Sequence, residues 1–183
     1  MVRNTLERVP RWPWLVALLT FLADQVSKFF AVRYLGPEAP RHSVPVIGSF
    51  LRFTYLENPG VSFGQLRDWS PLITFLTLAV AIGLAVGYRR LVTPSRWGNL
   101  ALGLVMGGAL GNLTDRLRTA FQVGLRQAYV VDFIDVRYYA VFNLADAAIT
   151  VGGILYGAYL LFFRSRPGEE KPWAQEASRP SED

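Results

Sequence analysis

The sequence predicts a membrane-embedded, all-α fold with four transmembrane helices and short β strands in an outer connection. Three observations support this. Of 183 residues, 51% are hydrophobic although 18% are charged, and the mean hydropathy is +0.24, so charges must be segregated from long apolar runs. Four segments approach or reach the roughly 20 apolar residues that a helix needs to cross a bilayer core. They cover residues of about 12–34, 71–88, 97–114 and 141–163.

The first apolar segment resembles a secretory signal peptide because Arg3, Arg8 and Arg11 precede it. No small-residue cleavage site follows, and Asp24 and Lys28 interrupt it instead. We therefore interpret it as part of the mature protein.

Basic residues predict the orientation, because short basic segments beside membrane helices stay in the cytoplasm. Besides the N-terminal arginines, the turn near residues 89–96 and the tail after residue 163 are basic and fall on the same side. Both termini are predicted to be cytoplasmic. The two outer connections, about 36–68 and 116–140, are longer and carry more widely spaced arginines.

Both outer connections contain strand-like sequence. Residues 44–56 and 129–136 are rich in β-branched and aromatic residues, and Gly and Pro punctuate the first stretch. Residues 164–183 are rich in Pro, Glu, Ser and Arg and lack an apolar period, which predicts a disordered cytoplasmic tail. Residues 1–163 are expected to form a single membrane domain.

Composition limits the chemistry that is available. The chain has no cysteine and one histidine, His42, which argues against thiol catalysis, a Ser-His-Asp triad or a histidine-rich metal centre. We expect neither a metal nor a cofactor. The net charge of +5 is spread over termini and loops, so nucleic-acid binding is not favoured.

Ionisable residues within apolar segments are costly and mark candidate functional sites. Asp24 and Lys28 lie four residues apart on one helical face, where they can neutralise each other. Two alternatives to a direct role remain open: the pair permits insertion only, or Lys28 extends its ammonium group to the outer interface.

The third segment combines small and polar residues. Gly103, Gly107 and Gly111 recur at intervals of four, which lets a neighbouring helix approach closely. Asn112, Asp115 and Arg116 follow at its outer end, and Asp115 and Arg116 are expected to form an ion pair at the interface. Gly108 lies within the same glycine-rich stretch.

The fourth segment begins with Asn143 and Asp146, and three further residues follow at intervals of three and four. These five positions predict one polar, small-residue face that turns into the helix bundle. The face comprises Asn143, Asp146, Thr150, Gly153 and Gly157.

By topology, polar residues of the first, third and fourth segments and of both outer connections map to the outer membrane boundary. A site at that level implies a substrate that lies partly in lipid and partly in water. The residues that share this level are Asp24, Lys28, Asn58, Asn112, Asp115, Arg116, Asp132, Asn143 and Asp146.

The most economical hydrolytic chemistry for these residues is a pair of carboxylates that share one proton. Asp146 is the first expected member. The candidate partners are Asp132, Asp135, Asp115 and Asp24. Asp132 is preferred because apolar residues flank it, which is expected to bring this part of the connection back to the membrane interface. Such a pair titrates as a unit, so the sequence does not assign the shared proton.

Five motifs together resemble the lipoprotein signal peptidases, also called signal peptidase II, over residues of about 14–163. They are Asp24-Gln-Val-Ser-Lys28, Glu57-Asn-Pro-Gly-Val-Ser-Phe-Gly64, Gly107-Gly-Ala-Leu-Gly-Asn-Leu-Thr-Asp-Arg116, Val130-Val-Asp-Phe133 and Phe142-Asn-Leu-Ala-Asp146.

The resemblance implies a small extracytoplasmic β platform near residues 50–63 and a periplasmic flap or helix in the second outer connection. It implies an inner-membrane aspartic endopeptidase that cleaves diacylglyceryl-modified prolipoproteins just before the lipidated cysteine and binds globomycin-type inhibitors. Asp132 and Asp146 would be catalytic. Supporting roles fall to Asp24, Lys28, Asn58, Gly108, Asn112, Asp115, Arg116 and Asn143.

In that picture Asn112 and Asn143 would orient the dyad or the scissile peptide, and Arg116 would hold a loop or a substrate carbonyl. The chain departs from the family pattern at Val61 and Ser62, where many relatives have two alanines, and in the short interval between Asp132 and Asp146.

Two other functions compete with a peptidase. A small transporter or proton relay also places ionisable residues in membrane helices, but it should carry them at several depths. A scaffold packed through its glycine faces would not need its aspartates.

Overall fold

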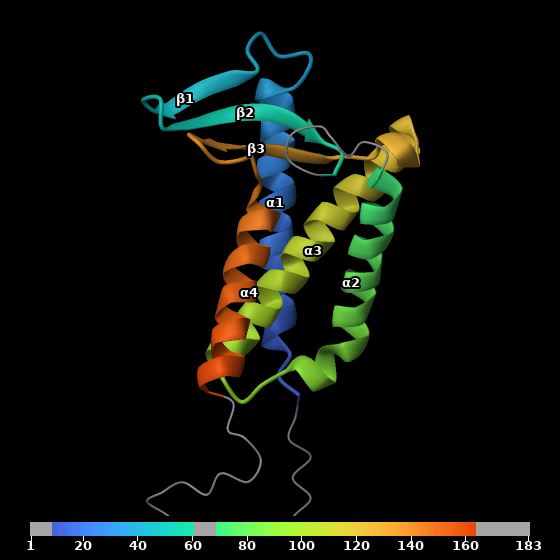
Figure 1. Cartoon of the computed structure of the whole chain (residues 1–183), viewed down its shortest axis with the longest axis vertical. Coiled ribbons are helices and arrows are strands. Elements are labelled where there is room, and N and C mark those ends of the chain that lie inside the picture. Colours follow the sequence, from blue (N-terminus) through green and yellow to red (C-terminus); the bar gives the residue numbers. More distant parts are fainter. Residues whose placement is uncertain (1–8, 61–68, 164–183) are drawn as a thin grey trace, which may run out of the picture.

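The structure is a computed structural model that describes residues 9–60 and 69–163. Within these residues four long helices form a bundle, a three-stranded sheet lies across one end of it, and both described ends of the chain lie at the other end (Figure 1). The elements are α1 (Trp12–Leu35), β1 (Ser43–Ile47), β2 (Leu51–Asn58), α2 (Ser70–Leu91), α3 (Arg96–Val123), β3 (Val130–Val136) and α4 (Leu144–Phe162).

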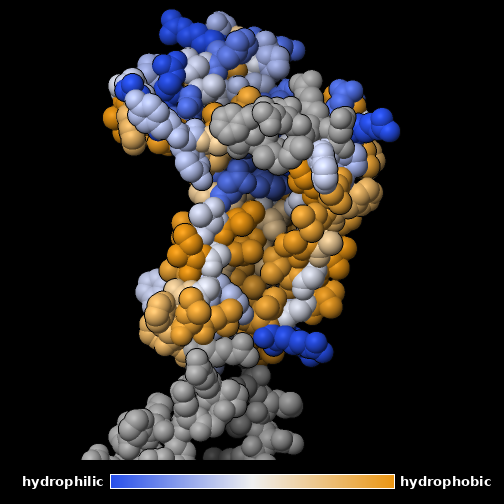
Figure 2. Space-filling model, viewed as in Figure 1, coloured by the Kyte–Doolittle hydropathy of each residue, from blue (hydrophilic) through white to orange (hydrophobic). Residues whose placement is uncertain are grey.

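Three of the helices, α1, α2 and α4, are long and apolar enough to cross a membrane among the residues described. Their outward surfaces form an apolar band between more hydrophilic ends (Figure 2). Three of the predicted membrane segments are thus helices whose length and composition allow them to cross a membrane. The fourth, α3, is longer still but carries several buried polar side chains, so it remains a predicted span.

Two of the helices extend beyond the predicted spans. Residues 71–88 are part of Ser70–Leu91, and residues 97–114 are part of Arg96–Val123. The third predicted segment stops before Asp115 and Arg116, but both residues lie within the helix, where they are buried and contact other elements. α3 ends at Val123, and its C-cap is Gly124, whose φ of 89° is a conformation that glycine adopts readily.

The strands predicted in the outer connections are present and pair with one another. The sheet has the order β1-β2-β3 and is antiparallel throughout. Its register places Leu56 opposite Asp132 and Asn58 opposite Val130. The sheet therefore brings Asn58 from the first connection beside Asp132 from the second.

Most of the second predicted connection has regular structure. Its first residues are the last turns of α3, a single turn of 3-10 helix covers Leu125–Gln127, and β3 follows. Other expectations lie outside the described residues. These are the tail at 164–183, the arginines Arg3 and Arg8, and the departure at Val61 and Ser62.

Small residues on α3 let its neighbours approach closely, as their spacing predicts. A Cβ atom on Gly103 would lie 2.7 Å from the Pro13 carbonyl oxygen of α1, and one on Gly107 would lie 2.5 Å from that of Ala17. On the α4 side, a Cβ atom on Gly108 would lie 2.6 Å from the Ala145 carbonyl oxygen. The helix backbones are in contact at these points.

The predicted inward face of α4 was partly wrong. Thr150 and Gly153 are exposed, and a Cβ atom on Gly153 would meet nothing within 4 Å. The stripe that packs on α3 is rotated and runs through Ala145, Ile149 and Gly152. Intervals of three and four describe either stripe, so spacing alone did not select the correct one.

We predict that Gly107→Ala destabilises the protein by about 1–3 kcal/mol, because the added methyl group overpacks the contact with α1. Gly153→Ala is the matched control. It should be neutral or stabilising, because alanine favours helix and nothing lies near its Cβ atom. Thermal unfolding of both variants in detergent tests this, and equal melting temperatures would contradict it.

Candidate active site

Polar side chains converge where the sheet meets the helices, in a hydrophilic recess above the apolar band (Figure 2). Asp24, Lys28, Asp115, Asp132 and Asn143 are each at most 2% exposed. Among the described residues no buried side-chain nitrogen or oxygen lacks a hydrogen-bond partner. The cluster is therefore a satisfied network, as burial of polar groups requires.

Asp132 lies on β3 and accepts two amide hydrogen bonds. Asn58 Nδ2 donates to its Oδ2 at 2.8 Å, and Asn143 Nδ2 donates to its Oδ1 at 2.7 Å. Asn58 ends the neighbouring strand β2, and Asn143 is the N-cap of α4. Both oxygens of this carboxyl are thus oriented by neutral donors.

Asp146 lies in the first turn of α4. Asn143 caps this helix: its Oδ1 accepts from the Asp146 backbone at 2.9 Å, and its own backbone N–H donates to Asp146 Oδ2 at 3.3 Å. Asn112 Nδ2 donates to Asp146 Oδ1 at 2.7 Å. Such a reciprocal cap fixes the start of the helix and the position of the carboxyl.

Asn143 connects the two carboxyl groups, because its side chain donates to Asp132 while its backbone donates to Asp146. Burial raises the pKa of Asp132 to about 7. The hydrogen bond from Asn58 lowers the pKa, the charge of Asp146 raises it, and Asn143 and Lys28 lower it. An aspartic acid in this setting can hold a proton near neutral pH.

Lys28 occupies the centre of a second layer behind the carboxyl pair. Its Nζ lies 2.9 Å from Asp24 Oδ2 and 2.9 Å from Asp115 Oδ2, and it donates to Asn112 Oδ1 at 3.0 Å. Because an ammonium group only donates, Asn112 must present its oxygen to Lys28. Its amide nitrogen is thereby directed to Asp146.

Two expectations about these charges are corrected. Lys28 does not extend to the interface but is 2% exposed, because oxygen acceptors surround its ammonium group. Asp115 pairs with Lys28, and distantly with Arg118, rather than with Arg116. Adjacent residues on a helix point in different directions, so Asp115 and Arg116 contact different groups although they are neighbours in the sequence.

Arg116 is directed to the loop after β2, where its Nη1 donates to the Pro59 carbonyl oxygen at 3.3 Å. In the same loop, the Gly60 backbone donates to Asn58 Oδ1 at 3.0 Å. The loop that follows Asn58 is thus held by Arg116 and by Asn58 itself. Asp135, the other candidate partner, accepts from Thr54 at 2.9 Å.

The sequence analysis did not identify two members of the network, Gln25 and the backbone of Ala145. Gln25 donates to Asp24, Asp115 and the Gly111 carbonyl at 3.2–3.3 Å. Its position beside Asp24 in an apolar segment was the available signal. Asp24 also accepts from the Ala145 backbone at 2.9 Å, a contact between α1 and α4 with no sequence signal.

Comparison with known proteins identifies the family of this chain. A family model described as Signal peptidase (SPase) II matches residues 16–162. The chain belongs to the signal peptidase II family.

Similar curated members of the signal peptidase II family are bacterial. A protein named lipoprotein signal peptidase from Moorella thermoacetica is 42% identical over 156 residues, covering 85% of this chain and 97% of that protein. One of the same name from Caldanaerobacter subterraneus subsp. tengcongensis is 40% identical, with 82% and 94% covered. A bacterial membrane enzyme solved by the in meso method at 2.3 Å resolution has a TM-score of 0.70 at 29% identity, with 87% and 93% covered.

We predict that Lys28→Met destabilises this signal peptidase II family member by about 3–5 kcal/mol, because two buried carboxylates lose their cation. Arg118→Met is the matched control. Arg118 contacts the same Asp115 at 3.8 Å, but its side chain is 50% exposed, so its loss should cost less than about 1 kcal/mol. Chemical unfolding in detergent measures both, and a similar loss in the two variants would contradict the prediction.

The raised pKa of Asp132 predicts a pH dependence of stability. Between 3.8 and about 7 the folded protein holds a proton that the unfolded chain has released. This contribution is complete below about pH 4 and is lost as the pH rises through 7, for a total of up to about 4 kcal/mol. Asp132→Asn cannot ionise and should show a flatter decline in melting temperature from pH 4.5 to 8. Parallel declines in variant and wild type would refute the prediction.

Proposed function

We propose that this chain is a membrane aspartic endopeptidase that removes signal peptides from lipoprotein precursors, with Asp132 and Asp146 as its catalytic pair. Family membership supports the activity. The single observation that carries the assignment is the bridge by Asn143, which donates to both aspartates. Asp24 and Asp115 are bound to Lys28 instead, and Asp135 accepts from Thr54.

The proposed reaction uses the pair as acid and base. One carboxylate takes a proton from a water molecule, whose oxygen attacks the peptide carbon, while the other carboxyl protonates the peptide oxygen. A tetrahedral diol forms. It collapses when the C–N bond breaks, the leaving nitrogen takes a proton, and a new carboxyl group and an amine result. The two aspartates share one exchangeable proton and titrate as a unit.

The surrounding amides hold the pair in position for this reaction. Asn112 and Asn143 orient the carboxyl groups, and Lys28 sets the direction of the Asn112 amide. Asn58 is the third donor, and Arg116 supports it by holding the following loop. Fixed donors lower the reorganisation that the reaction requires. Gly108 contributes by letting α4 approach α3.

The substrate is proposed to be a diacylglyceryl-modified prolipoprotein that is cut just before its lipidated cysteine. The recess lies between the apolar band and the hydrophilic sheet (Figure 2), which suits a peptide bond joined to a membrane-embedded signal sequence and a lipid. A globomycin-type cyclic peptide would occupy the same groove. Membrane lipid surrounds the bundle.

The proposed topology has four membrane spans, including α3, in the bacterial inner membrane. Both termini would be cytoplasmic and the site would lie near the outer face, because described arginines flank the inner ends of the helices, at positions 11, 89, 90 and 96. Residues 1–163 form one domain in this proposal. The sheet is its β platform, and the exposed connection between α3 and β3 is its flap.

Cleavage of a diacylglyceryl-modified prolipoprotein by the purified protein tests the pair. Asp132→Asn and Asp146→Asn should each reduce the rate at least about a thousandfold, because the shared proton chemistry is removed. Asp135→Asn, on the same strand, is the matched control and should retain cleavage. Loss of activity only in Asp135→Asn would reassign the partner of Asp146.

An inert wild type in that assay, together with an ion flux in vesicles that depends on Asp146, would favour the transporter. The described carboxylates do not suit conduction. They belong to the half of the molecule that carries the sheet, whereas a relay needs groups along the whole path.

A further inference from the structure

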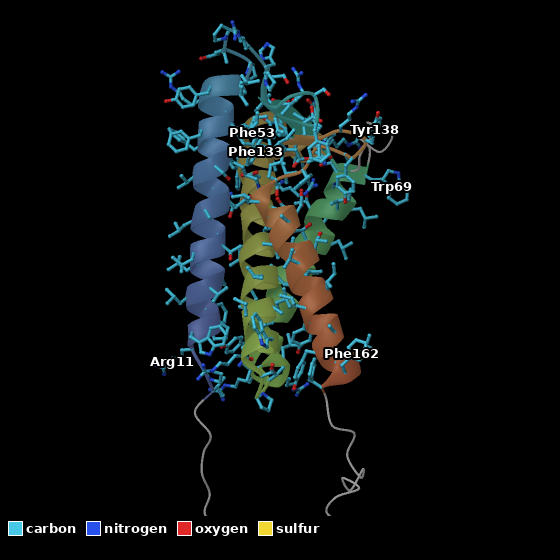
Figure 3. The ribbon with its side chains drawn as sticks, turned by 90° about the vertical axis from the view of Figure 1, so that its left-hand side faces the viewer. Arg11, Phe53, Trp69, Phe133, Tyr138 and Phe162 are labelled. Carbon is cyan, nitrogen blue, oxygen red and sulfur yellow. The ribbon has the colours of Figure 1, made fainter. Side chains whose placement is uncertain are left out.

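A second recess lies at the opposite end of the bundle from the aspartates, between the start of α1 and the end of α2. Its volume is about 690 Å³, within the range of roughly 300–1,000 Å³ for small-molecule sites. Arg11 marks this end in Figure 3, far from Phe53 and Phe133 beside the sheet. The lining residues are Val9, Pro10, Arg11, Trp14, Tyr88 and Arg89.

The walls of this recess are held in place by specific contacts. The Tyr88 hydroxyl donates to the Pro10 carbonyl oxygen, which fastens the segment before α1 to α2. The rings of Trp14 and Tyr88 lie with centroids 5.0 Å apart. Val9 packs on the buried cluster that contains Tyr88 and Met106. The recess is therefore part of the packed fold rather than a gap between independent helix ends.

The charged residues that line this recess, among those described, are both basic. Arg11 and Arg89 come from distant parts of the chain and line the same recess, and both are exposed. In the part of the chain that the structure describes, neither guanidinium makes an ion pair. The described acidic residues lie in the half that carries the sheet, at positions 24, 38, 57, 115, 132, 135 and 146. Two guanidinium groups thus line the recess with no acidic partner among residues 9–60 and 69–163.

The recess lies at the level of lipid headgroups if α1 and α2 cross the membrane, as their length and composition allow. Trp12 and Trp14 begin α1, and Tyr88 stands in the last turn of α2. Tryptophan and tyrosine concentrate at the membrane–water interface. The guanidinium groups therefore lie at the depth where phospholipid phosphates lie.

We propose that this recess binds the headgroup of an anionic glycerophospholipid, with its phosphodiester between Arg11 and Arg89 and its glycerol against Trp14 and Tyr88. Guanidinium forks match phosphate oxygens and form charge-assisted hydrogen bonds. A free phosphate ion has no apolar atoms to pack on Trp14 and Tyr88. The glycerol and the upper acyl carbons of a phospholipid do. A zwitterionic lipid is disfavoured, because its ammonium group would face two cations.

The test is lipid binding to the full-length, delipidated protein, measured by native mass spectrometry. Phosphatidylglycerol and phosphatidylcholine with the same acyl chains are titrated separately. Wild type should prefer phosphatidylglycerol. The Arg11→Gln/Arg89→Gln double variant should bind phosphatidylglycerol about 30-fold more weakly, since each basic residue at an anionic surface is worth roughly a factor of five. Its binding of phosphatidylcholine should not change.

The matched control is the Arg90→Gln/Arg96→Gln double variant, which removes the same charge from exposed arginines at the same end that do not line the recess. This control variant should keep most of the preference for phosphatidylglycerol over phosphatidylcholine. Equal losses in the two double variants would mean a diffuse surface charge and would overturn the proposal. So would equal binding of both lipids by wild type.

Two further arms complete the test. Soluble glycerol phosphate should not displace phosphatidylglycerol at comparable concentration, and displacement would show a site for soluble phosphates instead. If the glutamine double variant fails to fold, Arg11→Lys/Arg89→Lys keeps the charge but loses the planar fork. It should bind phosphatidylglycerol more weakly than wild type, and undiminished binding would overturn the proposed geometry. Both readouts are independent of peptidase activity.

Discussion

The ammonium group of Lys28 is the interaction on which the rest of the site depends. It lies between Asp24 and Asp115 and also donates to Asn112. Burying two carboxylates is costly unless a cation and hydrogen bonds compensate them. With that compensation in place, Asp24 accepts from the start of α4 and Asp115 accepts from the Val131 backbone of β3. One cation on α1 therefore ties together α3, α4 and the sheet.

The network can close only because the helices approach one another closely. α3 runs obliquely between its neighbours (Figure 1), and its glycines bring it against the backbones of α1 and α4. A side chain at Gly111 would collide with the Asp24 carboxylate. The compact charge network therefore requires the close approach of the helices. Small residues set the spacing, and the buried ions set which elements meet at that spacing.

The buried aspartates differ in the groups that they contact. Asp24 and Asp115 form ion pairs with Lys28, whereas Asp132 and Asp146 accept hydrogen bonds from the side-chain amides of asparagines. A carboxyl that is buried among neutral donors has its pKa raised by desolvation, as that of Asp132 is. The two environments lie in adjacent layers, because the Lys28 layer is directly behind the carboxyl pair.

The sequence by itself determined the membrane class, the approximate helices, the strands of the outer connections and the level at which the polar residues gather. These follow from local composition and period, which act over a few residues and do not depend on the partner. It also favoured Asp132 as the partner of Asp146. The tertiary structure decided the rest: that Lys28 pairs with Asp115 as well as Asp24, that Arg116 contacts Pro59, and which stripe of α4 packs on α3. Those choices depend on the rotation and separation of whole helices, which spacing along one chain leaves undetermined.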